Sequence, residues 1–245
     1  KKRVAMPSLT KSLLLTRTEI GNKQLAKQLH SVNENIKLVY GSLFEIQNRK
    51  THPKMDGIKA LIFTSKNAVF ASKALKIGAK IPVYCVGKST AEIAKKYGFL
   101  ALSSDGNSVD LIEFIKKNFK PDNGSMLYLR GEDIAFNTAE VLRESGYKIL
   151  EYVCYRQRRL KLENHILEKI SKEVIGSAVF FSPNSARFFA EEVQKLPDHF
   201  VAFCMSKTVA KTLKSGLPSS KIVYKVPKAP NFADMCKLII RSYGI

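Results

Sequence analysis

The stretch that decides the fold is "AVFFSPNSARFFAEEV", residues 178–193, because an earlier stretch repeats its pattern. The earlier stretch is "ALIFTSKNAVFASKAL", residues 60–75. In each, a short run of β-branched and aromatic residues meets Ser, Thr or Asn and then continues with helical spacing. A second matched pair follows, "VYCVGKSTAEIAKKYGF" at 83–99 and "VAFCMSKTVAKTLKSGL" at 201–217, at the same offset of about 118 residues. The repeat predicts two similar domains, each built from consecutive strand–helix units.

The same rhythm runs through other parts of the chain and sets the fold class. "SLLLTR" precedes "IGNKQLAKQLHSV", and "SMLYLRG" precedes "FNTAEVLRESGY". Short apolar strands that each precede a helix are typical of βαβ units and parallel sheets. We therefore predict an α/β protein with parallel sheets.

Two segments break this rhythm and predict the domain boundaries. They are "LVYGSLFEIQN" at 38–48 and "ILEYVCYRQRRLKL" at 149–162, and both are rich in strand-forming residues. If they pair as an antiparallel ribbon, residues 41–153 form an inserted domain. Residues 1–38 and 159–245 then form the other domain. We expect two α/β domains joined by a two-stranded β linker, with a binding cleft between them.

Composition limits the class of protein. The 245 residues are 45% hydrophobic and 25% charged, which are globular values. No apolar run approaches a membrane span, and "SLLL" is too short for a signal-peptide core. The four cysteines lack CxxC spacing and the four histidines are scattered, so neither a disulfide framework nor a metal site is expected. We expect a cytoplasmic monomer without a membrane partner.

The formal net charge of +20 predicts an anionic partner. Of the 41 basic residues 31 are lysines, which are spread along the chain in ones and twos. The basic groups also lack the aromatic interleaving of a single-strand binder. Nucleic-acid binding is therefore the weaker interpretation, and we expect a polyanionic small molecule.

Polar residues follow several predicted strands, where ligands bind in parallel sheets. Helix N-termini at these positions present unpaired N–H groups that suit anions. Ordinary helix capping is the better explanation for any single position, but several such ends with a cation indicate a donor-lined cleft. The candidate binding residues are Thr16, Arg17, Thr64, Ser65, Asn67, Ser89, Thr90, Arg130, Gly131, Ser182, Asn184, Ser185, Lys207 and Thr208.

Catalytic motifs are scarce. The chain has no GxGxxG, no GxxxxGK[ST] and no G-x-S-x-G pattern. Glu132-Asp133 is the nearest to a pair of carboxylates at a strand end, and we expect it to begin a helix.

Tyr155 is the titratable candidate between the predicted domains. It lies beside Arg156, Arg158 and Arg159, and cationic neighbours can lower the pKa of a phenol. Packing within a β ribbon is an equally good explanation for a tyrosine there.

The ordered motifs of the chain resemble the uroporphyrinogen-III synthase family. The resembling elements span residues 13 to about 240, and their joint order is more specific than any one of them. They are "LLLTR", "IFTSKNAV", "VYCVGKSTAEIA", "LYLRGE", "YVCYR", "VFFSPNSARFF", "CMSKTVAKTL" and "PNFADMCKLI". The resemblance implies two α/β domains, a β-ladder linker and an active site in the cleft.

The resemblance also implies the reaction. Hydroxymethylbilane, a linear tetrapyrrole with eight carboxylates, loses its terminal hydroxyl as water. The resulting azafulvene passes through a spiro intermediate, ring D is inverted, and the macrocycle closes as uroporphyrinogen III. No metal or organic cofactor takes part. Such an enzyme works mainly by orientation and electrostatic placement, with a weak acid assisting the leaving group.

By position, Tyr155 matches the family tyrosine that is proposed to assist loss of the hydroxyl. Ser65 and Thr90 match polar cleft positions, and Thr208 lies in a loop of functionally sensitive threonines. Asn67 stands where some members carry a cation. The alternative from another class is a two-domain anion-binding or sensor protein without catalysis, which would have no need of Tyr155.

Overall fold

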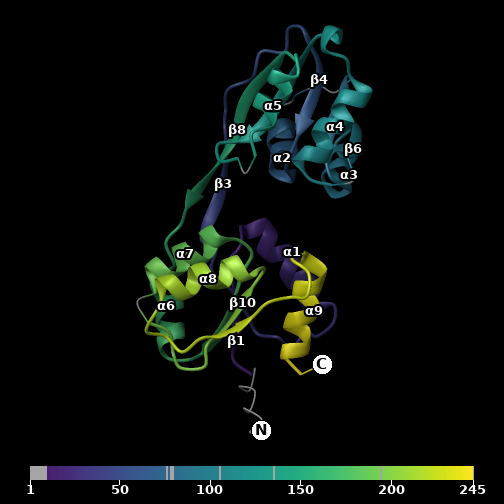
Figure 1. Cartoon of the computed structure of the whole chain (residues 1–245). Coiled ribbons are helices and arrows are strands. Elements are labelled where there is room, and N and C mark those ends of the chain that lie inside the picture. The colour runs from purple at the N-terminus through teal and green to yellow at the C-terminus, as the bar shows by residue number, and fades with distance from the viewer. Residues whose placement is uncertain are drawn as a thin grey trace. The chain divides into compact units, whose positions relative to one another are not determined.

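The computed structural model describes residues 10–75, 77, 80–104, 106–134, 136–193 and 195–244. The described chain divides into two compact units (Figure 1). Unit 1 takes the described residues up to Glu45 and those from Arg159 onward. Unit 2 is the continuous segment Ile46–Arg158.

Unit 1 is built on a parallel five-stranded sheet in the order β11-β10-β9-β1-β2. Its strands are β1 (Ser12–Leu15), β2 (Leu38–Tyr40), β9 (Ile175–Phe180), β10 (Val201–Cys204) and β11 (Val223–Lys225). Its helices are α1 (Glu19–His30), α6 (Asn164–Ser171), α7 (Pro183–Glu192), α8 (Lys207–Gly216) and α9 (Phe232–Ser242).

Both faces of this sheet are covered, which explains its continuous apolar strands. Leu13 and Leu15 pack with α1 and α9, whereas Leu14 between them packs with α6, α7 and α8. The alternation follows from the two-residue period of a strand.

Unit 2 contains a six-stranded sheet in the order β3-β8-β7-β4-β5-β6. Its strands are β3 (Phe44–Asn48), β4 (Ile58–Phe63), β5 (Pro82–Val86), β6 (Leu100–Ser104), β7 (Ser125–Gly131) and β8 (Ile149–Arg159). Its helices are α2 (Lys66–Ala74), α3 (Lys88–Lys96), α4 (Ser108–Asn118), the 3₁₀ turn η1 (Pro121–Asn123) and α5 (Thr138–Glu144). In this spatial order, β8, β7, β4, β5 and β6 each run parallel to the next strand.

Helices again cover both faces. Leu61 and Phe63 of β4 pack with α2 and α3, and Ile62 packs with α4 and α5. The repeat seen in the sequence corresponds to β4–α2–β5–α3 in unit 2 and β9–α7–β10–α8 in unit 1. The predicted α/β class with parallel sheets is confirmed.

The chain passes between the units within β3 and β8, which run antiparallel. The Arg49 N–H donates to the Cys154 carbonyl at 2.8 Å, and the Leu160 N–H donates to the Leu43 carbonyl at 2.9 Å. The segment 38–48 is, however, not one strand, because β2 belongs to the parallel sheet of unit 1. Gly41 separates β2 from β3, and a Cβ there would lie 2.7 Å from Cδ1 of Leu14.

Two further expectations concern the described chain as a whole. No helix in its described part is both long and apolar enough to cross a membrane. All four cysteines are buried and unbridged, as expected of small core residues.

Candidate active site

Three neighbouring strands of unit 2 bring the candidate site together. β4 ends at Phe63, and Thr64 and Ser65 follow it. β7 ends at Gly131, and Tyr155 lies in β8. Because β4, β7 and β8 are parallel neighbours, these residues meet near the carboxyl ends of β4 and β7, where ligands bind in such folds.

An irregularity in the strand register places the Tyr155 ring. Arg130 of β7 aligns with Val153 of β8, but the next residue, Gly131, aligns with Tyr155. A Cβ on Gly131 would lie 2.7 Å from Cζ of Tyr155 and 2.8 Å from its hydroxyl oxygen. Glycine at position 131 therefore leaves the space that the phenol occupies.

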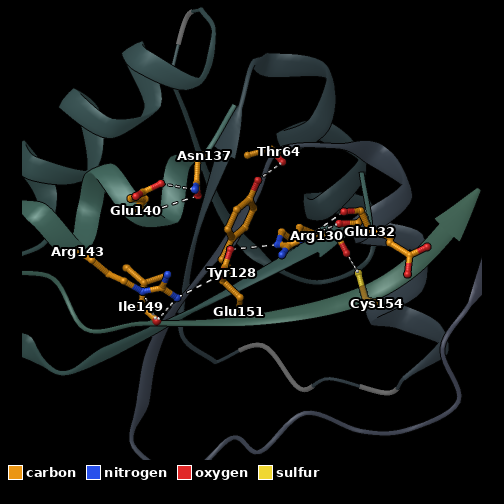
Figure 2. Close-up of polar contacts among 11 residues, drawn as sticks. Thr64, Tyr128, Arg130, Glu132, Asn137, Glu140, Arg143, Ile149, Glu151 and Cys154 are labelled. Atoms are coloured by element: carbon orange, nitrogen blue, oxygen red, sulfur yellow. Dashed lines mark hydrogen bonds and ion pairs between the residues drawn. The ribbon is translucent and has the colours of Figure 1, made fainter. Parts of the chain in front are cut away.

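Two consecutive hydroxyl side chains hold two phenols. The Tyr155 hydroxyl lies 2.9 Å from Ser65 Oγ, and the Tyr128 hydroxyl lies 2.9 Å from Thr64 Oγ1. Figure 2 shows the contact between Tyr128 and Thr64. Ser65 Oγ also accepts from the Ala68 N–H at 3.2 Å and so caps α2. Ser65 thus joins the start of a helix to the phenol of Tyr155.

These groups surround a cavity of about 180 Å³. It has room for several water molecules or for one end of a larger ligand. The lining residues are Thr64, Ser65, Ser108, Tyr128, Gly131, Asp133, Ile134, Phe136 and Tyr155. The cavity is therefore rich in hydroxyl groups.

Burial controls the ionisation of Tyr155. The residue is 8% exposed, and removal from water raises the pKa of its phenol above the ordinary value of 10.0. Hydrogen bonds with Ser65 and Asn67 oppose that rise without reversing it. Tyr155 is therefore a neutral phenol at neutral pH and can act as a hydrogen-bond donor.

The expectation that arginines lower the pKa of Tyr155 is wrong. Arg156 Nε donates to Gln47 Oε1 at 3.1 Å. Arg159 forms ion pairs with Glu191 and Glu192. Alternation along the strand turns Arg156 away from Tyr155, and Arg159, four residues further along, pairs with acids of α7. Neither arginine is among the causes that shift the pKa of the phenol.

Arg130 is engaged within unit 2. Its Nε lies 3.1 Å from Glu151 Oε1, and its Nη1 donates to the carbonyls of Gly131 and Glu132 at 2.9 and 3.2 Å (Figure 2). Glu151 also pairs with Arg143 at 3.3 Å. The contacts of Arg130 brace the end of β7, beside the cavity.

Glu132-Asp133 does not begin a helix. α5 starts at Thr138, and the Asn137 side chain caps it by accepting from the Glu140 N–H at 3.4 Å (Figure 2). Asn followed three residues later by Glu is the stronger start signal. Asp133 instead lines the cavity, which the sequence interpretation missed.

The remaining candidates of unit 2 lie at other helix starts. Asn67 is half-buried in the first turn of α2. At α3 the cap position is Gly87, with a φ of 70°, and no side chain caps the helix. Ser89 is exposed, and Thr90 is buried.

In unit 1, Thr16 and Arg17 have different environments. Thr16 is fully buried, and its hydroxyl donates to the Val179 carbonyl at 2.5 Å. The Arg17 guanidinium lies 4.3 Å from the ring centre of Phe181 and 5.7 Å from that of Phe232. Its Nη1 is buried and has no hydrogen-bond partner within the described chain. Arg17 therefore keeps a donor available, whereas Thr16 does not.

The sequence interpretation also missed Asn22, which holds the backbone of Arg17. Its Oδ1 accepts from the Arg17 N–H at 2.9 Å, and its Nδ2 donates to the Arg17 carbonyl at 3.0 Å. Its Nδ2 also lies 3.1 Å from the Leu15 carbonyl. An asparagine on the apolar face of α1 was the available signal.

The last candidates flank the starts of α7 and α8. Ser182 and Ser185 form a reciprocal capping box at α7, with N···O distances of 3.2 Å in both directions. Asn184, Lys207 and Thr208 are exposed in the first helical turns. Ser206, and not Lys207 or Thr208, caps α8 by accepting from the Val209 N–H at 3.3 Å.

Within the described residues, no group of three or more His, Cys, Asp or Glu side chains is placed to hold a metal ion. The polar groups of the cavity are hydroxyls, phenols and a carboxylate. These groups suit hydrogen bonding and proton transfer.

Comparisons with known proteins identify the relatives of this chain. The family model described as uroporphyrinogen-III synthase HemD matches residues 36–235. The search of curated proteins finds no match. Among solved structures, the uroporphyrinogen-III synthetase of Helicobacter pylori is similar with a TM-score of 0.63 and 21% identity, over 94% of this chain and 99% of that chain. A mutant uroporphyrinogen III synthase of Thermus thermophilus is similar with a TM-score of 0.52 and 15% identity, over 94% and 98%. At these identities the structures show a shared fold.

Proposed function

The chain belongs to the uroporphyrinogen-III synthase family, a family of lyases, and we propose that it converts hydroxymethylbilane to uroporphyrinogen III. The observation that carries this proposal is the family match over residues 36–235. The cavity with the Tyr155 phenol supports it, because loss of a hydroxyl group needs a weak acid beside the leaving oxygen.

Tyr155 has the properties of that acid. Burial keeps its phenol protonated at neutral pH, and Ser65 orients the hydroxyl at 2.9 Å. The phenol donates to the departing hydroxyl while the C–O bond of the hydroxymethyl group breaks. The oxygen keeps the bonding electron pair, gains a proton and leaves as water.

The carboxylates of the substrate need cationic and N–H donors. In unit 1, Arg17 has a buried donor without a partner in the described chain, and the first turn of α8 presents backbone N–H groups. In α7, Pro183 has no N–H and the Ser185 N–H donates within the capping box, so Asn184 offers the N–H of the first turn. In unit 2, α2 and α3 offer similar helix starts beside Asn67, Ser89 and Thr90. These groups bind carboxylates and fold the linear substrate into the shape that cyclises.

The proposal is tested by supplying the purified protein with freshly generated hydroxymethylbilane and separating the uroporphyrin isomers after oxidation. The expected product is isomer III, formed faster than the spontaneous reaction. Isomer I alone, formed at the spontaneous rate, would leave the non-catalytic anion-binding alternative, which no observation on this chain now favours.

Several expectations stay predictions. They are the binding cleft between the units, the monomeric state, the cytoplasmic location, the independence from cofactors and the lack of a nucleic-acid partner. The isomer assay in cofactor-free buffer with a chelator tests the independence from cofactors directly. Sedimentation of the active protein tests whether it is a monomer.

A further inference from the structure

We propose that Asp133 is a second catalytic residue of this site, which stabilises the positive charge that forms on the substrate ring when the hydroxyl leaves. The proposal rests on the synthase function proposed above. It assigns a role to the carboxylate that lines the Tyr155 cavity.

Asp133 gives the cavity its charge. Among the described residues that line it, Asp133 alone carries a charged side chain, and the others are hydroxyl-bearing, apolar or glycine. Within the described chain no hydrogen bond or ion pair engages the Asp133 carboxylate. Arg130, three residues earlier in the chain, is paired with Glu151 at 3.1 Å. Asp133 therefore lines the same cavity as Tyr155, and its carboxylate has no partner within the described residues.

This charge determines which part of the substrate suits the cavity. Like charges repel, so the acetate and propionate groups of the substrate are disfavoured beside Asp133. The hydroxymethyl group and the N–H of its pyrrole ring are the polar, uncharged part of the molecule. Hydroxyls and phenols suit that hydroxymethyl group, and a carboxylate suits a pyrrole N–H.

The reaction makes this ring positive. When the C–O bond breaks, its electron pair leaves with the oxygen, and the ring nitrogen donates its lone pair toward the exocyclic carbon. The ring then carries a positive charge shared between nitrogen and carbon, and a facing carboxylate lowers the energy of that state. Asp133 next accepts the N–H proton, which leaves the neutral azafulvene.

The protons balance over this step. Tyr155 gives one proton to the leaving hydroxide, which departs as water. Asp133 takes one proton from the ring nitrogen, and that proton returns to the Tyr155 oxygen through solvent in the cavity. The substrate thus loses one molecule of water and both side chains are restored.

The test compares Asp133→Asn, Asp133→Glu and the control Glu132→Gln in the isomer assay. Glu132 is the neighbouring acid and does not line the cavity, so Glu132→Gln removes the same charge from the same loop. We expect Asp133→Asn to lower kcat about 100-fold, which is the lower end of the range for a positioned acid or base, because the residue is exposed. We expect Asp133→Glu to recover most of that loss.

A second readout separates this role from a structural one. Asp133→Asn removes a negative charge that faces a polyanionic substrate, so KM should stay the same or fall while kcat falls. A distorted site would raise KM and lower the melting temperature.

Two results would overturn the proposal while leaving the synthase function intact. One is wild-type turnover by Asp133→Asn, and the other is an equal loss in Glu132→Gln. If the wild-type protein forms only isomer I, the synthase function itself fails and the role of Asp133 fails with it.

Discussion

At the scale of single residues, the position and the pKa of the Tyr155 phenol depend on a missing side chain at Gly131 and on the lack of a cation beside the ring within the described chain. Gly131 has no side chain, and a Cβ there would lie 2.7 Å from the Tyr155 ring. The nearby arginines are paired elsewhere, so burial, and not a cation, decides the pKa. The site therefore contains a neutral hydrogen-bond donor in a tight space.

Replacing Tyr155 by Phe removes the proposed acid. We expect kcat to fall about 100-fold or more while isomer III remains the product, because substrate folding by the other groups is kept. The fold should survive, since the lost contact with Ser65 is one hydrogen bond worth about 1 kcal/mol. The measurement is the rate of isomer III formation by each variant.

The matched control is Tyr152→Phe on the same strand. The Tyr152 hydroxyl lies 2.9 Å from Thr51 Oγ1, and Tyr152 does not line the cavity. Equal turnover of the Tyr155 and Tyr152 variants would remove the acid role of Tyr155.

Gly131→Ala tests the role of the Tyr155 phenol by moving its ring out of position. The added methyl group must push the Tyr155 ring away, since the contact would be shorter than any ordinary packing distance. We expect kcat to fall and the free energy of unfolding to drop by about 1–3 kcal/mol. In a Tyr155→Phe background the further loss of kcat should be small, because the hydroxyl is already gone. If the loss of kcat in the double variant equals the product of the losses in the two single variants, this account is contradicted.

At the scale of elements, a side chain at a helix start can cap the helix and can also bind a ligand. Ser65, Ser182 and Ser206 each accept from a backbone N–H of the following helix. A hydroxyl used as a cap can still bind a ligand, so stability and binding must be separated by experiment.

Ser182 allows that separation. Replacement by Ala removes half of the capping box of α7, and we expect a loss of about 1 kcal/mol in the free energy of unfolding. Replacement by Gly should cost only a few tenths of a kcal/mol, because Gly is tolerated at this position. Urea unfolding of both variants measures the difference. If Ser182 also binds substrate, the Gly variant keeps its stability but shows a higher KM.

An Ala variant as stable as the wild type would contradict the capping role. A Gly variant with unchanged KM would leave capping as the whole role of Ser182.

The elements were the part of this molecule that could be predicted best from sequence. The repeated strand–helix pattern of 60–75 and 178–193 reflects local propensity and period, and it appears in the structure as β4–α2 and β9–α7. The short edge strand β11 was not predicted, because three residues carry too little pattern, and β2 was expected as part of the linker strand 38–48.

The contacts of the site were less predictable. Tyr155 and Ser65 were both expected to matter, but their pairing depends on the register shift beside Gly131, which no local pattern encodes. Asp133 was read as a helix start, and only tertiary structure places it on the cavity wall. For Tyr155 the sequence left open whether cationic neighbours or packing matter, and the structure favours packing, because burial raises the pKa and the adjacency of arginines in sequence does not give the direction of their side chains.

At the scale of the whole molecule, each unit has its own packed interior. The core clusters that contain Leu14 and Leu13 lie on the two faces of the unit 1 sheet, and those that contain Phe63 and Ile62 lie on the two faces of the unit 2 sheet. Charge, in contrast, is a property of the chain as a whole, and the formal net charge is +20.

This charge predicts that association with a polycarboxylate depends on salt. A net positive protein attracts a polyanion over several ångströms, and the screening length shrinks from about 10 Å at 0.1 M salt to about 3 Å at 1 M. We expect kcat/KM for hydroxymethylbilane to fall about tenfold between 0.05 and 0.5 M NaCl, with kcat nearly constant because the chemical step occurs in a confined cavity. The spontaneous formation of isomer I, followed in parallel without protein, corrects for any effect of salt on the substrate. KCl at equal ionic strength should give the same fall, whereas a constant kcat/KM across the range would show that the surface charge does not guide this substrate.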